Sequence, residues 1–95
     1  MKLLTKPIIL LKEVESEICK LLKEKDIDEA VKVIINYLAR HRVIIYEEKP
    51  KIVIYAFDIE QRPVITMFFS NFAISIKESH IYINPITIVK FPFED

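Results

Sequence analysis

The side chains of this chain that could do chemistry are few, and no spacing connects them. Asp58, Glu60 and Arg62 lie within the short stretch 58–63, and His80 comes later. Two nearby carboxylates could bind a divalent cation with help from elsewhere, and a histidine could act as a general base beside an acid and a nucleophile. A small hydrolase or nuclease using Asp58, Glu60 and His80 is therefore our third functional hypothesis. A solvated turn with a local ion pair, followed by an ordinary turn histidine, explains the same residues more simply.

The only dense basic stretch lies around residue 41. Arg40 and Arg42 flank a histidine, and Lys49 and Lys51 follow beside the first predicted strand connection. Contacts from these four side chains to phosphates would make the protein a nucleic-acid-binding accessory protein, which is our second hypothesis. The formal net charge is zero, however, and cations also complement the C-terminal end of a helix. We favour the second interpretation, in which these cations complement the C-terminal end of the preceding helix.

Cysteine, histidine and glycine usage restricts the remaining chemistry. Cys19 is the only cysteine, which excludes an internal disulfide, and the two histidines can supply no more than one pair of zinc ligands. The position of Cys19 within a predicted helix indicates a small, half-buried and inert thiol. The chain contains no glycine, so it lacks a phosphate-cradling loop, a dinucleotide fingerprint and a glycine-flanked nucleophile elbow. We expect no catalytic residue, no metal ion and no cofactor.

The composition indicates one small apolar domain over residues 1–95, with 52% hydrophobic residues. Isoleucine and lysine are abundant, whereas glutamine, asparagine, cysteine and methionine are scarce. This composition resembles that of short reading frames from thermophilic archaea and their viruses, and AT-rich coding explains part of the glycine deficit. No apolar run is long enough to span a membrane, and the first residues lack the pattern of a signal peptide. We therefore expect a cytoplasmic protein.

Apolar residues recur at helical spacing up to about residue 41. The first helix is predicted to begin after Thr5 or Lys6, with Pro7 in its first turn, where a missing N–H costs nothing. The second is predicted to begin at Asp26, whose carboxylate can accept hydrogen bonds from the first-turn amides. The very short gap between the two helices implies a tight helical hairpin or a sharp bend. The predicted buried faces are Leu11, Val14, Ile18 and Leu21 in the first helix and Ile27, Ala30, Val31, Ile34, Tyr37 and Leu38 in the second.

From Val43 onward the pattern changes to short segments rich in isoleucine, valine, phenylalanine and tyrosine, which are typical of strands. Their short connections favour antiparallel neighbours, because a parallel crossover needs a dozen residues or more. Asn71 is the residue best suited to a turn position with positive φ. The last two candidates could form one strand bent at Pro85. The candidate strands are 43–48, 51–58, 63–69, 72–77, 80–84 and 86–91.

This order of elements predicts an α+β fold. An N-terminal helical hairpin, over about residues 6–41, packs on one face of an antiparallel meander of four to six strands, over about residues 43–91. Parallel α/β folds are excluded, because helices and strands do not alternate. The architecture is similar to helix-on-curved-sheet folds such as the cystatin-like and nuclear-transport-factor-like folds. That similarity rests on element order alone and implies no function.

The two faces of the predicted sheet differ along the chain. Segment 72–77 alternates apolar and smaller or polar residues, as a strand with one wet face does, whereas 52–57 and 64–69 are apolar on both sides. Two helices, each about 10 Å wide, cover only one face of a sheet whose strands lie about 4.8 Å apart. A second apolar patch on the sheet therefore remains exposed. The simplest partner that could bury it is a second copy of the chain, related to the first by a twofold axis. The alternative is a sheet that closes on itself and buries both sides.

Our first hypothesis is therefore a non-enzymatic protein-interaction or assembly module that acts as a homodimer or as a small subunit of a larger complex. It would bury an apolar sheet surface and pair backbone at a sheet edge. Aromatic side chains on an open sheet also stack on nucleobases, but few basic residues are interleaved here. The predicted interface is Val53, Tyr55, Phe57, Val64 and Phe68, or whichever face of that hairpin the helices leave open.

Overall fold

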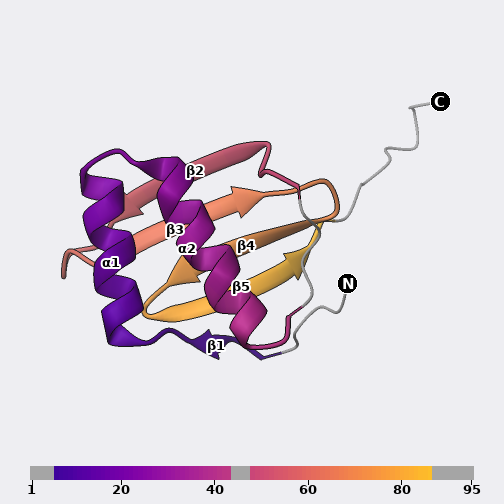
Figure 1. The fold of residues 1–95 in the computed structure, drawn as a ribbon, viewed down its shortest axis with the longest axis horizontal. Helices are drawn as coiled ribbons and strands as arrows, with labels where there is room; N and C mark the ends of the chain where they lie inside the picture. Colours follow the sequence, from indigo (N-terminus) through magenta and orange to yellow (C-terminus); the bar gives the residue numbers. More distant parts are fainter. Residues whose placement is uncertain (1–5, 44–47, 87–95) are drawn as a thin grey trace.

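The computed structural model describes residues 6–43 and 48–86, which form two helices and one five-stranded sheet. Figure 1 shows both helices on the same side of the sheet. The fold is α+β, with N-terminal helices packed against an antiparallel sheet, as predicted. In chain order the elements are β1 (Ile8–Ile9), α1 (Lys12–Lys23), α2 (Ile27–Arg40), β2 (Ile52–Phe57), β3 (Pro63–Phe68), β4 (Phe72–Lys77) and β5 (His80–Pro85).

Helix α2 forms where its local sequence predicts. Asp26 is the N-cap, and its Oδ1 accepts a hydrogen bond of 3.4 Å from the Glu29 N–H. This bond satisfies one of the amides that the first helical turn leaves free. The predicted apolar face meets the core: its buried members are Ala30, Ile34, Tyr37 and Leu38, and its partly buried members are Ile27 and Val31.

The first helix begins later than predicted. Helix α1 starts at Lys12 rather than near Pro7, and the residues between them form β1. β1 pairs antiparallel with β5, and the N–H of Leu10 donates to the carbonyl of Ser79 at 2.8 Å. These partners lie about seventy residues away in the sequence, so local spacing could not reveal them.

The late start of α1 changes which of its residues are buried. Leu11, predicted on the apolar face, is the N-cap and is 56% exposed. Ile18 is fully buried, as predicted, and Val14 packs at the margin of the core. Glu15, which is not part of the predicted apolar face, is only 8% exposed. Its burial follows from a partner on the β4–β5 turn, described below.

The sheet has the strand order β1-β5-β4-β3-β2, with every neighbouring pair antiparallel. Strands β2 to β5 form the predicted meander, and their bounds differ from the prediction by one residue or so at either end. β1 adds an unpredicted strand beside β5. The predicted strand 43–48 falls mostly outside the described residues, and neither 43 nor 48 is in a strand. The predicted strand 86–91 also lies outside them, except for residue 86, which is not in a strand.

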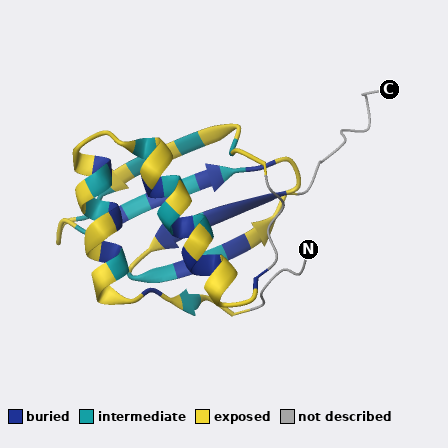
Figure 2. Cartoon of the chain, in the orientation of Figure 1, coloured by how far each residue is buried: buried dark blue, intermediate teal, exposed yellow. Residues whose placement is uncertain are grey.

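The core lies between the two helices and the sheet. Figure 2 shows buried residues concentrated on the three inner strands and on the inner sides of the helices. The rings of Phe69 and Phe72 stack with centroids 4.6 Å apart. Neither α1 nor α2 has the length and apolar run that crossing a membrane requires. Fully buried side chains include Ile18, Leu22, Ile34, Leu38, Ile65, Met67, Ile74, Ile76 and Ile81.

Five non-glycine residues in the described part take positive φ, a conformation that normally favours glycine. Asn71, predicted to be such a residue, is not among them, so that prediction is wrong. The turn around Asn71 is instead closed by a hydrogen bond of 2.9 Å from the Phe69 N–H to the Phe72 carbonyl. One positive-φ residue follows the C-terminus of each helix, and the others lie in the β2–β3 and β4–β5 turns. The residues are Lys25, Arg42, Gln61, Glu78 and Ser79.

Candidate interaction surface

One face of the sheet carries no helix from the described residues. Directly opposite residues of paired strands project to the same face, and successive residues along a strand alternate. Ile65 pairs with Ile76, and Met67 with Ile74, on the helix-covered side. The residues between them therefore project to the other side, which we call the open face. The open face consists of Ile9, Ile52, Ile54, Ala56, Val64, Thr66, Phe68, Ala73, Ser75, Lys77, His80, Tyr82 and Asn84.

The β2–β3 half of the open face has an unusual composition for a sheet surface that meets water, whereas the β4–β5 half is mostly polar. Such surfaces are normally polar, alternating with the apolar core face. Here Ile52 and Ile54 are 58% and 59% exposed, and Lys77, at the end of β4, is the only member with a formal charge. Near the centre, Thr66 Oγ1 and Ser75 Oγ lie 3.2 Å apart in a mutual hydrogen bond. Because these hydroxyls partly satisfy one another, the face can lose water at modest cost.

The structure divides the five residues predicted to form an interface. Val53, Tyr55 and Phe57 point toward the helices and pack against the core. Val64 and Phe68 lie on the open face. Alternation along a strand separates the two sets, but only packing of the helices decides which set is covered. Among residues 6–43 and 48–86 the sheet does not close on itself, since β1 and β2 form its two edges.

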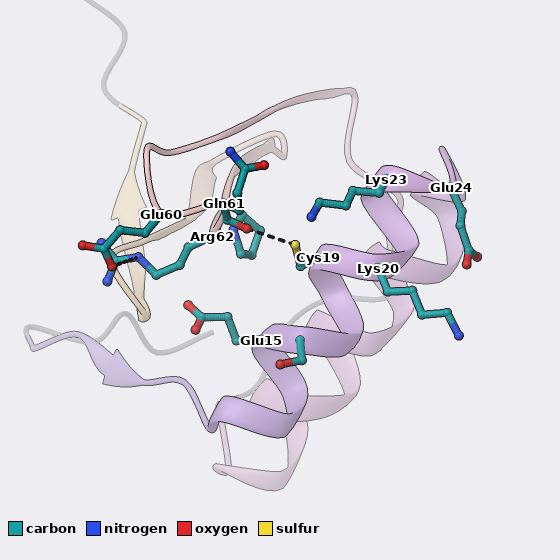
Figure 3. A pocket seen from close by; sticks show the side chains of 10 residues that line it. Glu15, Cys19, Lys20, Lys23, Glu24, Glu60, Gln61 and Arg62 are labelled. Carbon is teal, nitrogen blue, oxygen red and sulfur yellow. Dashed lines mark hydrogen bonds and ion pairs between the residues drawn. The ribbon is translucent and has the colours of Figure 1, made fainter.

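A hollow of about 460 Å³ lies between α1 and the β2–β3 turn. Figure 3 shows that the Cys19 thiol points from α1 toward this turn, where Sγ donates to the Gln61 carbonyl at 3.2 Å. This contact joins the middle of α1 to the β2–β3 turn. Acidic and basic side chains line the hollow in similar numbers, so it presents no strong field of either sign. The lining charged residues are Glu15, Lys20, Lys23, Glu24, Glu60 and Arg62.

The turn beside this hollow is held together by Asp58. Its Oδ1 accepts from the backbone N–H of Arg62 at 2.8 Å and from that of Glu60 at 2.9 Å, and its Oδ2 accepts from Arg62 Nε at 2.8 Å. The backbone bond from Arg62, followed by the guanidinium bond, lowers the pKa of Asp58 below its ordinary value. The same carboxylate raises the pKa of Arg62. The predicted local ion pair is therefore present, and its acids are engaged in shaping the turn.

Glu15 is a buried polar residue that the sequence pattern did not reveal. Its Oε2 accepts a hydrogen bond of 2.7 Å from Ser79 Oγ, which joins α1 to the β4–β5 turn. Ser79 takes positive φ, so the turn aims its hydroxyl toward the helix. A carboxylate at the fourth position of a helix, between Val14 and Ser16, gives no sequence signal of burial. We interpret this contact as a structural tie between the two layers.

The four basic residues of the second hypothesis do not gather at one place. Arg40 ends α2, where its guanidinium lies 5.7 Å from the centre of the Tyr37 ring. The Tyr37 hydroxyl donates to the Ile9 carbonyl at 3.1 Å, so this end of α2 lies over the β1 edge. Lys51 precedes β2 at the opposite edge, with Lys49 just before it. The two edges are four strand spacings apart, or about 19 Å.

Arg42 follows α2 with φ of 61°, and its N–H donates to the Ala39 carbonyl at 3.0 Å. This places Arg42 at the helix C-terminus, the position expected from the helix dipole. It lies with Arg40 near the β1 edge rather than with the lysines that precede β2. The structure therefore gives no continuous basic surface to these four residues.

The residues of the third hypothesis are also separate. His80 begins β5, and its Nδ1 lies 2.8 Å from the Glu78 carbonyl oxygen. Asp58 and Glu60 belong to the β2–β3 turn, and no hydrogen bond joins either of them to His80 in the described residues. Within residues 6–43 and 48–86, no group of three or more histidine, cysteine, aspartate or glutamate side chains could hold a metal ion. Comparison with known proteins adds no assignment, because no protein family, curated protein or solved structure matches the chain.

Proposed function

We propose that the protein is a non-enzymatic assembly module whose open face stacks on the open face of a second copy. The observation that carries this proposal is the apolar surface of β2 and β3 on the sheet face that the two helices do not cover, a face on which Lys77 is the only formal charge. A contiguous exposed apolar patch on a small domain marks an interaction surface. A twofold copy is the partner that such a face meets most simply.

The polar groups of the open face favour a second copy over an unrelated apolar partner. After Thr66 and Ser75 bond to each other, one hydroxyl hydrogen of the pair remains free. A twofold partner would present the same pair near the centre and so could accept that hydrogen. Lys77 lies at the end of β4, so the two lysines of a stacked dimer can stay at the rim, in water. No like charges would meet at the centre.

The size of the open face sets the expected affinity. Four six-residue strands cover about 20 Å by 20 Å, which is a footprint of about 400 Å² per copy. Stable interfaces bury about 800 Å² per partner. The stacked dimer should therefore be weak, with a dissociation constant on the order of 10 µM. The fraction of dimer should therefore change with protein concentration across the range that analytical ultracentrifugation covers.

A pair of matched isoleucine substitutions tests the proposal. Ile54 lies on the open face, whereas Ile59 is 96% exposed in the β2–β3 turn and lies outside it. Ile54→Glu removes roughly 1 kcal/mol of apolar burial per copy and places a carboxylate in the contact, so the dissociation constant should rise at least about 30-fold. Ile59→Glu should leave it unchanged, and circular dichroism checks that both variants fold. Equal sedimentation of wild type and Ile54→Glu at all concentrations would reject the proposal.

A further inference from the structure

We infer that β2 also pairs edge to edge with β2 of a second copy, antiparallel, about a twofold axis perpendicular to the sheet. The five strands of each copy would then join into one continuous sheet. This contact uses backbone groups at an edge, whereas the proposed function uses side chains on a face. The inference therefore adds a second interface to the same assembly module and can fail independently of the first.

Strand β2 has the features of an unprotected edge. It pairs with β3 along six residues, and no strand of the described residues lies on its other side. Proteins usually block such edges with proline, charged side chains, β-bulges or very short strands. The segment Ile52–Phe57 contains no proline, glycine or charged residue. The opposite side of the sheet differs, because β1 covers β5 there and is itself only two residues long.

The backbone groups that point to the free edge can be identified from the ladder. The N–H of Asp58 donates to the carbonyl of Arg62 at 3.0 Å, in continuation of the β2–β3 register. Bonded and non-bonded positions alternate along an antiparallel pair. Within β2, every second residue before Asp58 therefore bonds to β3. Lys51, just before the strand, departs from this alternation, because its N–H donates to the Phe68 carbonyl at 2.7 Å. The residues of β2 between the bonded ones direct their N–H and carbonyl groups outward, and they are Val53, Tyr55 and Phe57.

This set of groups is complementary to itself under a twofold rotation. With Tyr55 opposite Tyr55 of the second copy, Val53 comes opposite Phe57 of that copy. All three residues of each strand then exchange hydrogen bonds with the other strand. Opposite residues also share a face, as a continuous sheet requires, because all three project to the helix side. The partly exposed Tyr55 and Phe57 rings would gain cover from their counterparts.

The charges at the two ends of β2 favour the same antiparallel arrangement. Lys51 directly precedes β2 and Lys49 lies two residues before it, so the charges next to the start of the strand are basic, with Glu47 and Glu48 further back in the sequence. Asp58 and Glu60 make its other end acidic, since Arg62 offsets only one of them. Rotation of one copy by 180° sets the basic end of each strand against the acidic end of the other. A parallel arrangement would instead set like charges together.

The first experiment follows hydrogen exchange of the β2 amides by NMR at two protein concentrations about 100-fold apart. At the higher concentration, where the protein associates, exchange of Val53, Tyr55 and Phe57 should slow by about 100-fold or more, and dilution should restore the intrinsic rate. The Ile54 amide, bonded to β3 in every state, should stay protected. Intrinsic exchange of the three amides in an associated sample would overturn the inference. Protection that persists on dilution would overturn it too, because a segment of the same chain would then cover the edge.

Two variants separate the edge contact from the face contact. Val53→Pro removes one outward N–H without breaking a bond to β3, which edge strands tolerate. Phe68→Glu changes only the open face. When both interfaces exist and their axes intersect, the wild type reaches a closed tetramer at high concentration and each variant stops at a dimer. A wild type that reaches only a dimer supports the inference if Val53→Pro makes it a monomer. The inference fails if that dimer is dispersed by Phe68→Glu alone.

A poorly folded Val53→Pro protein would not leave the question open. N-methylation of Tyr55, introduced by chemical ligation, removes an outward N–H and leaves every side chain in place. This variant should lose edge association to the same extent, at least about 10-fold in the dissociation constant. Unchanged association of a folded N-methyl variant would contradict the inference directly.

Discussion

Replacing Gln61 by glycine should stabilise the protein, although most glycine substitutions in folded elements destabilise. Gln61 has φ of 63° in the β2–β3 turn, and its side chain is exposed. A left-handed conformation costs a non-glycine residue about 1–2 kcal/mol. Glycine removes that strain but gains unfolded-state entropy worth about 0.4–1 kcal/mol. The backbone bonds to Asp58 and Cys19 remain possible with glycine, because they use only backbone atoms of Gln61.

The net effect should be a stabilisation of about 0.7 kcal/mol, or a rise in Tm of roughly 3–5 °C. Ile59→Gly is the matched control, since Ile59 is 96% exposed in the same turn and does not have positive φ. That control gains unfolded-state entropy without relief of strain and should lose about 0.4–1 kcal/mol. Urea and thermal unfolding, followed by circular dichroism at one fixed low concentration, measure both variants while holding association constant. A Gln61→Gly protein that loses as much stability as Ile59→Gly would refute the strain argument.

Two further predictions concern polar contacts. The pKa of Asp58 is lowered in the folded state, so its stabilisation is fully present above the unfolded pKa of about 3.9 and is lost as pH falls through the lower folded pKa. Asp58→Asn should therefore be less stable than wild type at neutral pH, and the gap should close below about pH 4 in a urea-midpoint titration. The buried Tyr37 hydroxyl donates to the Ile9 carbonyl at 3.1 Å and accepts from the Leu11 N–H at 3.2 Å. Tyr37→Phe should cost about 1–3 kcal/mol and expose the β1 amides to faster hydrogen exchange, whereas a neutral substitution would show that water replaces the hydroxyl.

The meander and the second helix could be predicted from the sequence because their signals are local. An N-cap at Asp26 and apolar spacing identify α2, and alternation identifies 72–77 as a strand with Ile74 and Ile76 on one side. Strand β1 could not be predicted. Two residues carry no periodicity, and their strand geometry depends on hydrogen bonds to β5. Hydrogen bonding to β5 therefore outweighs the local preference for a helix that begins near Pro7.

The candidate surface was only partly predictable for the same reason. Alternation separates Val53, Tyr55 and Phe57 from the other set on β2, but both sets are apolar. Nothing in their residue types says which set meets the helices. The basic residues around Arg40 and Lys51 are close in sequence, yet the sheet order places them near opposite edges.

The sequence by itself determined the α+β class, the antiparallel meander and the existence of more apolar sheet surface than two helices can cover. These follow from short-range periodicity, short connections and composition, which act whatever the final packing. Only the tertiary structure decided which face the helices leave open, that β2 is the last strand of the sheet formed by the described residues, and that Glu15 is buried against Ser79. Those outcomes depend on contacts between segments far apart in the chain, where the energy comes from packing and long-range hydrogen bonds rather than from local preference.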